Sequence, residues 1–169
     1  MGMYKYEKEA FAKEYKERSK EYKQRITSWR NAPTVSKINK PSNIARAREL
    51  GYKAKQGIIV ARVKVRGGKK KRKSFDGGRK PSKSGRFFTR AKSLQSIAED
   101  RAAKKFPNCE VLNSYFVGKS GVESFYEIIL LERDNPVIAK NKEYNRIISQ
   151  KGRSFRGLTS SGKKHRGIK

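Results

Sequence analysis

The stretch VLNSYFVGKSGVESFYEIILL, residues 111–131, decides the fold because it lies in the most apolar part of the chain. It contains two apolar runs, 111–117 and 122–131, separated by Gly118, Lys119, Ser120 and Gly121. Two such runs joined by a short segment that contains glycine are typical of a β-hairpin. The glycine spacing also resembles the GxxG clamp of KH domains, but that clamp joins two helices. The sequence therefore predicts two antiparallel strands joined by a turn.

A helix is predicted immediately before this hairpin, from about residue 90 to residue 105. Asp100 and Lys104 stand four residues apart, which favours an ion pair along the helix, and Pro107 ends the run. The apolar side chains recur at helical spacing, at Leu94, Ile97, Ala98, Ala102 and Phe106. This segment therefore has one apolar side that can cover a sheet.

A third strand is predicted over residues 58–66. Its side chains alternate, with Ala61, Val63 and Val65 on one face and Arg62, Lys64 and Arg66 on the other. All three predicted strands need cover for apolar residues, and only the helix 90–105 has a matching apolar side. We therefore expect an α+β fold, in which a small mixed or antiparallel sheet packs with helices.

The N-terminal part of the chain predicts further helices. Residues 4–29 carry an apolar stripe at helical spacing, which favours packing on the core over stacking on nucleic-acid bases: Tyr4, Phe11, Tyr15, Tyr22, Ile26 and Trp29. Ser42 or Asn43 can cap a short helix that runs to Leu50, and Gly51 suits its C-terminal cap. After Asn135-Pro136 a short helix around 138–148 is also possible.

Charge is distributed unevenly along the chain. The 169 residues hold 44 Lys and Arg against 15 Asp and Glu, a net charge of +29, yet residues 99–150 are neutral overall. Residues 22–98 and 151–169 carry most of the excess. We interpret this as one domain, 1–169, with a body at 42–66 and 90–150. Its extensions are the helix 4–29, a basic loop 67–90 and a basic tail 151–169. The loop and tail, rich in Gly, Ser, Lys and Arg, are expected to become ordered only on a bound partner.

Several kinds of function are excluded by what the sequence lacks. No apolar run is long enough for a signal peptide or a membrane span, so we expect a cytoplasmic protein with no membrane partner. Cys109 and His165 are single and far apart, which predicts no zinc site, and the glycine pairs lack the spacing of a P-loop. No acid and base pair is readable. We therefore expect no metal, no cofactor, no small-molecule substrate and no catalytic residue.

Excess positive charge of this size indicates a polyanionic partner, and the basic side chains are the candidate contacts. Lys53, Lys55, Arg62, Lys64 and Arg66 are expected to be central, because they flank the point where a capped helix passes into a half-basic strand. The complete predicted RNA-binding set is Arg46, Arg48, Lys53, Lys55, Arg62, Lys64, Arg66, Lys69, Lys70, Lys71, Arg72, Lys73, Arg79, Lys80, Lys83, Arg86, Arg153, Arg156, Lys163, Lys164, His165 and Arg166.

Six blocks of the sequence resemble, in order, the e-type protein fifteen of the large ribosomal subunit. They are Met3–Tyr6, Gly51–Gly57, Arg62–Arg66 before two glycines, Lys92–Glu99, Val111–Gly118 and Arg156–Lys164. The resemblance runs over nearly the whole chain. Eukaryotic members of that family continue with a further basic, histidine-rich tail, and this chain stops soon after the last block, so we expect an archaeal source.

The resemblance implies a non-catalytic structural protein of the large ribosomal subunit. It implies a small α/β body with long basic extensions that bind large-subunit ribosomal RNA, and a place in the cytoplasmic ribosome beside neighbouring ribosomal proteins. A nucleic-acid-compacting or chaperone protein is the alternative that the charge alone would allow. An RNA-modifying enzyme would need a cofactor loop or an acid and base pair, and the sequence shows neither.

Overall fold

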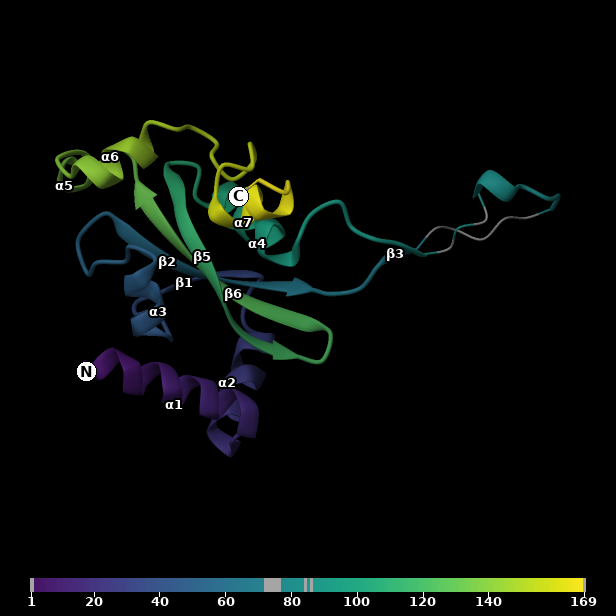
Figure 1. Cartoon of the computed structure of the whole chain (residues 1–169), viewed down its shortest axis with the longest axis horizontal. Helices are drawn as coiled ribbons and strands as arrows, with labels where there is room; N and C mark the ends of the chain where they lie inside the picture. Colours follow the sequence, from purple (N-terminus) through teal and green to yellow (C-terminus); the bar gives the residue numbers. More distant parts are fainter. Residues whose placement is uncertain (1, 72–76, 84, 86, 169) are drawn as a thin grey trace.

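The computed structural model of the chain describes residues 2–71, 77–83, 85 and 87–168. Within these residues the elements follow one another in the order labelled in Figure 1. They are α1 (Met3–Glu17), α2 (Lys20–Asn31), β1 (Val35–Ile38), α3 (Ile44–Glu49), β2 (Ile58–Arg66), β3 (Lys70–Lys71), the 3-10 helix η1 (Pro81–Lys83), β4 (Phe87–Phe88), α4 (Leu94–Lys105), β5 (Cys109–Ser120), β6 (Glu123–Glu132), α5 (Pro136–Ala139), α6 (Lys142–Ile148) and α7 (Ser160–His165).

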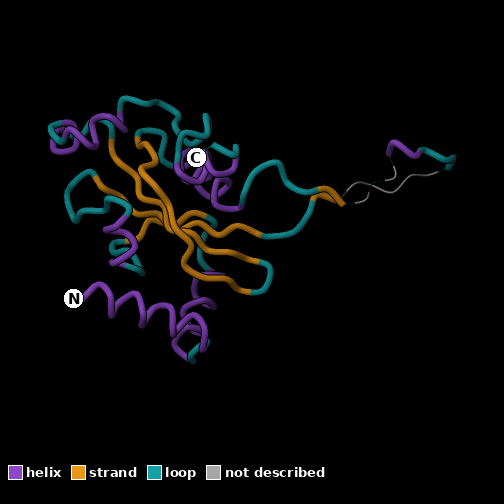
Figure 2. Tube along the Cα trace, viewed as in Figure 1, coloured by secondary structure: helices purple, strands orange, loops and turns teal. Residues whose placement is uncertain are grey.

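A four-stranded antiparallel sheet forms the centre of the molecule (Figures 1 and 2). Its strand order is β1-β2-β6-β5, so β6 lies between β2 and β5 and pairs with both. The hairpin predicted from residues 111–131 is confirmed, although β5 continues three residues closer to the turn, to Ser120, and β6 begins at Glu123, after the turn that Gly121 and Val122 form. Gly121 has a φ of +51°, in the left-handed region where glycine carries no steric cost. The predicted α+β class is confirmed.

Helix α4 covers one face of the sheet, as the apolar pattern predicted (Figure 1). Ala98 and Ala102 pack against Val63, Val65 and Ile128 in a cluster that excludes solvent, and Leu94 and Ile97 are half-buried against the same cluster. The helix begins at Leu94, four residues later than predicted, because the hydroxyl of Ser93 accepts a hydrogen bond from the Ser96 N–H and so caps its first turn.

Helices α2 and α3 cover the opposite face of the sheet. Tyr22, Ile26 and Trp29 of α2 are buried there together with Ala47 of α3 and with side chains of β5 and β6. The prediction that this stripe packs on the core is confirmed from Phe11 to Trp29, whereas Tyr4 is exposed. Gly118 allows the close approach, because a Cβ atom at this position would lie 2.9 Å from both Ile26 Cδ1 and Tyr22 Oη. The second glycine of the GxxG pattern serves the turn, so both have structural roles.

The N-terminal segment is two helices, and the prediction of a single helix over residues 4–29 is wrong. The backbone of Arg18 has a φ of +50°, the left-handed conformation, which ends α1. Ser19 then caps α2 by accepting a hydrogen bond from the Tyr22 N–H at 3.2 Å. The change of direction lets α2 enter the core while α1 runs past α3.

Arg18→Gly is expected to raise the free energy of unfolding by roughly 0.5–1 kcal/mol. Relief of the left-handed conformation raises the free energy of unfolding by about 1–2 kcal/mol. The greater conformational freedom of glycine in the unfolded chain lowers it by about 0.5–1 kcal/mol. Denaturant unfolding measures the difference. Ala12→Gly, in the exposed interior of α1, is the control and should cost about 1 kcal/mol. If both variants lose stability, Arg18 is not under strain.

The two basic segments predicted to be extensions behave differently from each other. Between β2 and α4 the described residues run away from the body, and β3 pairs with β4 there (Figures 1 and 2). The segment after residue 150 instead folds against the body, and its helix α7 lies on α4. Thr159 is fully buried and Ser154 and Ser161 nearly so. None of the helices in the described part of the chain combines the length and apolar character needed to cross a membrane.

Candidate nucleic-acid interface

Three glutamates are almost completely buried in this strongly basic chain. Glu99, Glu110 and Glu127 expose 1%, 5% and 0% of their surface. A buried carboxylate is costly unless hydrogen bonds or a cation compensate for lost water. Here each carboxylate binds a segment that leads into or out of a basic part of the chain. The three buried carboxylates therefore hold the basic segments in place. They do not neutralise the cations on the surface of these segments.

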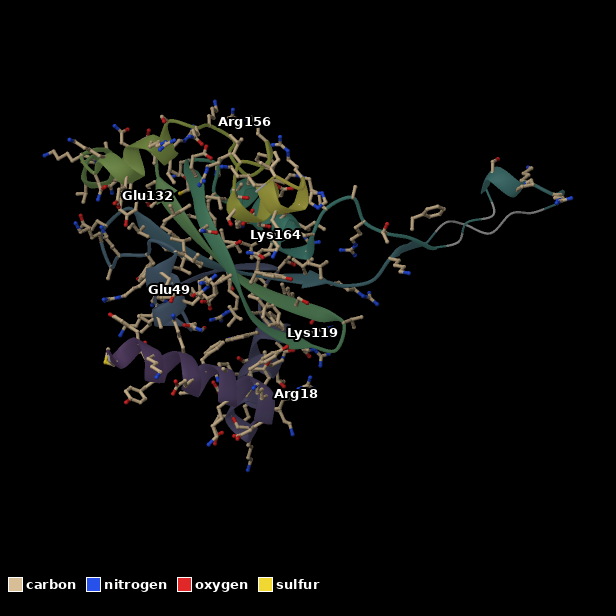
Figure 3. All side chains as sticks on the ribbon, viewed as in Figure 1. Arg18, Glu49, Lys119, Glu132, Arg156 and Lys164 are labelled. Atoms are coloured by element: carbon tan, nitrogen blue, oxygen red, sulfur yellow. The ribbon has the colours of Figure 1, made fainter. Side chains whose placement is uncertain are left out.

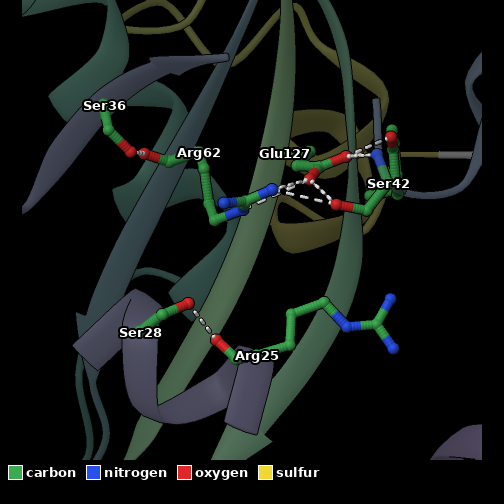
Figure 4. A network of polar contacts seen from close by, with 7 residues as sticks. Arg25, Ser28, Ser36, Ser42, Arg62 and Glu127 are labelled. Atoms are coloured by element: carbon green, nitrogen blue, oxygen red, sulfur yellow. Dashed lines mark hydrogen bonds and ion pairs between the residues drawn. The ribbon is translucent and has the colours of Figure 1, made fainter. Parts of the chain in front are cut away.

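Glu127 of β6 is the centre of the first of these networks (Figure 4). It accepts hydrogen bonds from the backbone N–H and hydroxyl of Ser42, at 2.9 and 2.7 Å, and from the hydroxyl of Tyr115 at 2.5 Å. Arg62 forms an ion pair with it at 3.1 Å and lies 4.0 Å above the Trp29 ring. Burial, followed by the neighbouring carboxylate, raises the pKa of Tyr115, which keeps this hydroxyl a donor.

Lys64 is also used inside the protein. Its ammonium group donates to the carbonyl oxygens of Arg30 at 2.6 Å and Ala32 at 2.7 Å, at the end of α2. The alternation of β2 was predicted correctly, but Arg62 and Lys64 of its basic face contact Trp29, Arg30 and Ala32, at the end of α2, instead of facing an RNA. We therefore remove Arg62 and Lys64 from the predicted central contacts. Arg66, at the end of the strand, is exposed, as are Lys53 and Lys55.

Two buried glutamates hold the C-terminal segment. Glu99 of α4 accepts hydrogen bonds from the hydroxyls of Ser114 and of Thr159, the latter at 2.6 Å. Glu110 of β5 accepts from the backbone N–H groups of Gly152 at 2.9 Å and Arg153 at 3.2 Å. Both glutamates come from the neutral part of the sequence. The basic tail is thus fixed to the body by acids that lie more than forty positions earlier in the chain.

The glycines of the tail serve close packing. Thr159 caps α7 by accepting from the Gly162 N–H at 3.0 Å, and a Cβ atom at Gly162 would lie 2.7 Å from the Gly157 Cα. Arg153, predicted to bind RNA, points inward and donates to the carbonyl oxygens of Val111 and Leu112, both at 2.9 Å. This guanidinium is a structural group, and we remove it from the predicted set as well.

Glu99→Gln is expected to become more stable, relative to the natural protein, as the pH rises from about 4 toward neutrality. Burial raises the pKa of Glu99, and the hydroxyls of Ser114 and Thr159 oppose that rise only in part. Because the folded pKa lies above the unfolded one, the stability from the protonated carboxyl is complete below the ordinary glutamate pKa and is lost as the pH passes the raised value. Glutamine resembles the protonated form at every pH.

Denaturant unfolding at several pH values tests this prediction. Glu17→Gln, at an exposed position of α1, gives the reference for removing one surface carboxylate. If the difference between Glu99→Gln and the natural protein stayed constant with pH, Glu99 would not be the titrating group.

Besides Lys53, Lys55 and Arg66, the predicted contacts that remain on the surface form three groups. Arg46 and Arg48 lie on α3, where Arg46 pairs with Glu49 at 2.8 Å and Arg48 contacts the hydroxyl of Tyr4. Lys69, Arg79 and Lys80 lie in the loop between β2 and α4; Arg72, Lys73 and Arg86 fall outside the described residues, as do the side chains of Lys70, Lys71 and Lys83. The largest group lies on the C-terminal segment: Arg156, Lys163, Lys164, His165 and Arg166.

The C-terminal cations project from a folded scaffold (Figure 3, where Arg156 and Lys164 are labelled). Arg166 donates to the Arg156 carbonyl at 3.2 Å, which ties the end of α7 to the preceding loop. Arg146 of α6, which the sequence analysis did not select, lines the same hollow as Arg156 and Lys163. It stands alone among polar and apolar neighbours in the sequence, so only the fold brings it to this surface.

Neither a metal-binding cluster nor a reactive thiol is found among the described residues. They contain no group of three or more His, Cys, Asp or Glu side chains that could hold a metal. Cys109 is buried, and burial raises the pKa of its thiol to about 11, so it is protonated at neutral pH and a poor nucleophile. It belongs to the core cluster beneath α4, in agreement with a packing role.

The chain is similar to a known protein family and to a curated protein of the large ribosomal subunit. Residues 2–169 match the protein family described as Ribosomal L15. The chain is 50% identical over 149 residues to the large ribosomal subunit protein eL15 of the archaeon Metallosphaera sedula, an alignment that covers 86% of this chain and 69% of that protein.

Proposed function

Because the chain belongs to the ribosomal L15e family, we propose that it binds large-subunit ribosomal RNA by contacting phosphates with the cations that its fold leaves on the surface. It is a structural protein of the large ribosomal subunit, and the resemblance found in its sequence is confirmed. Phosphate contacts supply most of the affinity of such an interface and position the protein without reading sequence.

One observation carries the proposal furthest: the buried carboxylates bind the basic segments from within. Glu99 and Glu110 fix the C-terminal segment, and Glu127 fixes the connection before α3. The exposed cations of these segments are therefore held on a rigid support, so less conformational entropy is lost when they meet phosphates. The proposed contacts are Arg46, Arg48, Lys53, Lys55, Arg66, Lys69, Arg79, Lys80, Arg146, Arg156, Lys163, Lys164, His165 and Arg166.

The proposal also covers the binding partners of the protein and its location in the cell. The protein acts without catalysis and without a cofactor, and it resides in the cytoplasmic ribosome, where neighbouring ribosomal proteins also touch it. The loop between β2 and α4 reaches furthest from the body among the described segments, and it is the part suited to enter between RNA helices (Figure 1).

Sedimentation in a sucrose gradient tests the function. A tagged copy of the full chain should move with the large subunit and leave it only as the salt concentration is raised, since screening weakens phosphate contacts. A nucleic-acid-compacting protein would distribute with bulk DNA or RNA and would not follow the large-subunit peak. That distribution would refute the proposal.

A further inference from the structure

A hollow of about 610 Å³ lies between α6 and the C-terminal segment. We propose that this hollow binds one unpaired nucleotide of ribosomal RNA, with the base inside and its phosphates at the rim. The inference rests on the proposed function and deepens it, because it assigns to this chain a site that reads a base in addition to surfaces that grip phosphates.

The size and floor of the hollow suit a base. Cavities of about 300–1,000 Å³ hold small ligands, so a single nucleotide fits within this volume. Ile147 and Leu158 line it with half-buried apolar surface. Beneath them Arg153 is held by the Val111 and Leu112 carbonyls and also donates to the Leu158 carbonyl at 3.4 Å. The floor is therefore fixed before any ligand enters.

Cations from three separate segments converge on the rim. Arg146 comes from α6, Arg156 from the loop that follows it, and Lys163 from α7, and all three side chains are exposed. A second Arg156 contact, from its guanidinium to the Lys151 carbonyl at 2.8 Å, limits the freedom of this side chain. Phosphates on either side of an extruded nucleotide would be bound by such a rim, and guanidinium planes can stack on a base.

Two further lining residues can recognise the edge of a base. Gln150 offers both a donor and an acceptor, the combination that pairs with adenine, and Glu143 accepts hydrogen bonds from exocyclic amino groups. A carboxylate does not favour a phosphate, so its presence among the cations argues for a base and against a simple phosphate cradle or an acidic peptide.

Chemical probing of large-subunit ribosomal RNA bound to the full chain tests the site. Reagents that modify the Watson–Crick edges of bases report the nucleotide, and hydroxyl radicals report the backbone. Gln150→Ala removes the proposed base contact without changing the charge. We expect one unpaired nucleotide, protected by the natural protein, to become several-fold more reactive with Gln150→Ala, while the backbone protection stays. Asn145→Ala, which removes a neutral amide from α6, five residues before Gln150 and outside the hollow, should match the natural protein.

The outcomes separate this inference from the function on which it rests. If the natural protein protects the RNA backbone but Gln150→Ala leaves every base as reactive as before, the nucleotide site is refuted while RNA binding stands. The nucleotide site is equally refuted if cross-linking through Gln150 in the assembled subunit captures an acidic protein segment. If the natural protein protects no part of the RNA, the proposed function itself fails.

Discussion

Glu127→Ala is expected to lower the free energy of unfolding by about 3–5 kcal/mol, the range for breaking a buried ion pair by removing one partner. The change leaves the Arg62 guanidinium, only 16% exposed, without its carboxylate, and it removes the acceptor of the Ser42 and Tyr115 hydroxyls. Four segments meet at this carboxylate, namely β2, β5, β6 and the connection before α3, so their docking should weaken together. Denaturant unfolding at neutral pH measures the loss.

Two comparisons identify the cause of that loss. Glu49→Ala breaks the exposed ion pairs of Glu49 with Arg46 and Lys8 and should cost about 1 kcal/mol or less. The double variant Glu127→Leu with Arg62→Leu removes both charges, so it should recover much of the stability that Glu127→Ala loses. If Glu127→Ala cost no more than Glu49→Ala, the buried network would not organise the fold.

The sheet and α4 could be predicted because their apolar residues repeat with the period of the element. Val63 and Val65 alternate with cations, and Ala98 and Ala102 recur at helical spacing, so the local pattern and the tertiary packing require the same residues. The break at Arg18 was not predictable in this way. The apolar stripe continues across it. A left-handed residue is usually recognised in a sequence as glycine or asparagine, and here the position is an arginine.

The candidate site was predicted less completely, because a pattern shows that a strand has two faces but not what covers each one. Arg62 and Lys64 have the alternation of a surface, yet α2 lies over them. The tail was misjudged for a related reason. Thr159 and Ser161 look like residues of an unstructured segment until Glu99 and Ser96, some sixty positions earlier, are known to bind them. Such pairings over long sequence distances are not visible in one sequence.

The combined variant Arg146→Ala, Arg156→Ala, Lys163→Ala and Lys164→Ala is expected to show the largest loss of RNA affinity. Each phosphate contact releases counterions and adds about 0.7–0.9 to the slope of log affinity against log salt, so four lost contacts should make that slope shallower by about three. At 0.1 M salt the same change corresponds to a loss of about three orders of magnitude in affinity. Filter binding of large-subunit ribosomal RNA across a series of salt concentrations measures both quantities.

The control for this prediction removes the same charge from another part of the molecule. Lys13, Lys16, Lys20 and Lys23 are exposed on α1 and α2, where Glu14, Glu17 and Glu21 lie among them in the sequence and offset part of their charge, so their replacement by alanine should change the slope little. The four C-terminal cations are exposed and lie outside the buried networks of Glu99 and Glu110, so the unfolding midpoint should stay near that of the natural protein. If both fourfold variants reduced the slope equally, affinity would follow total charge, and the rigidly held C-terminal cations would have no special part in binding.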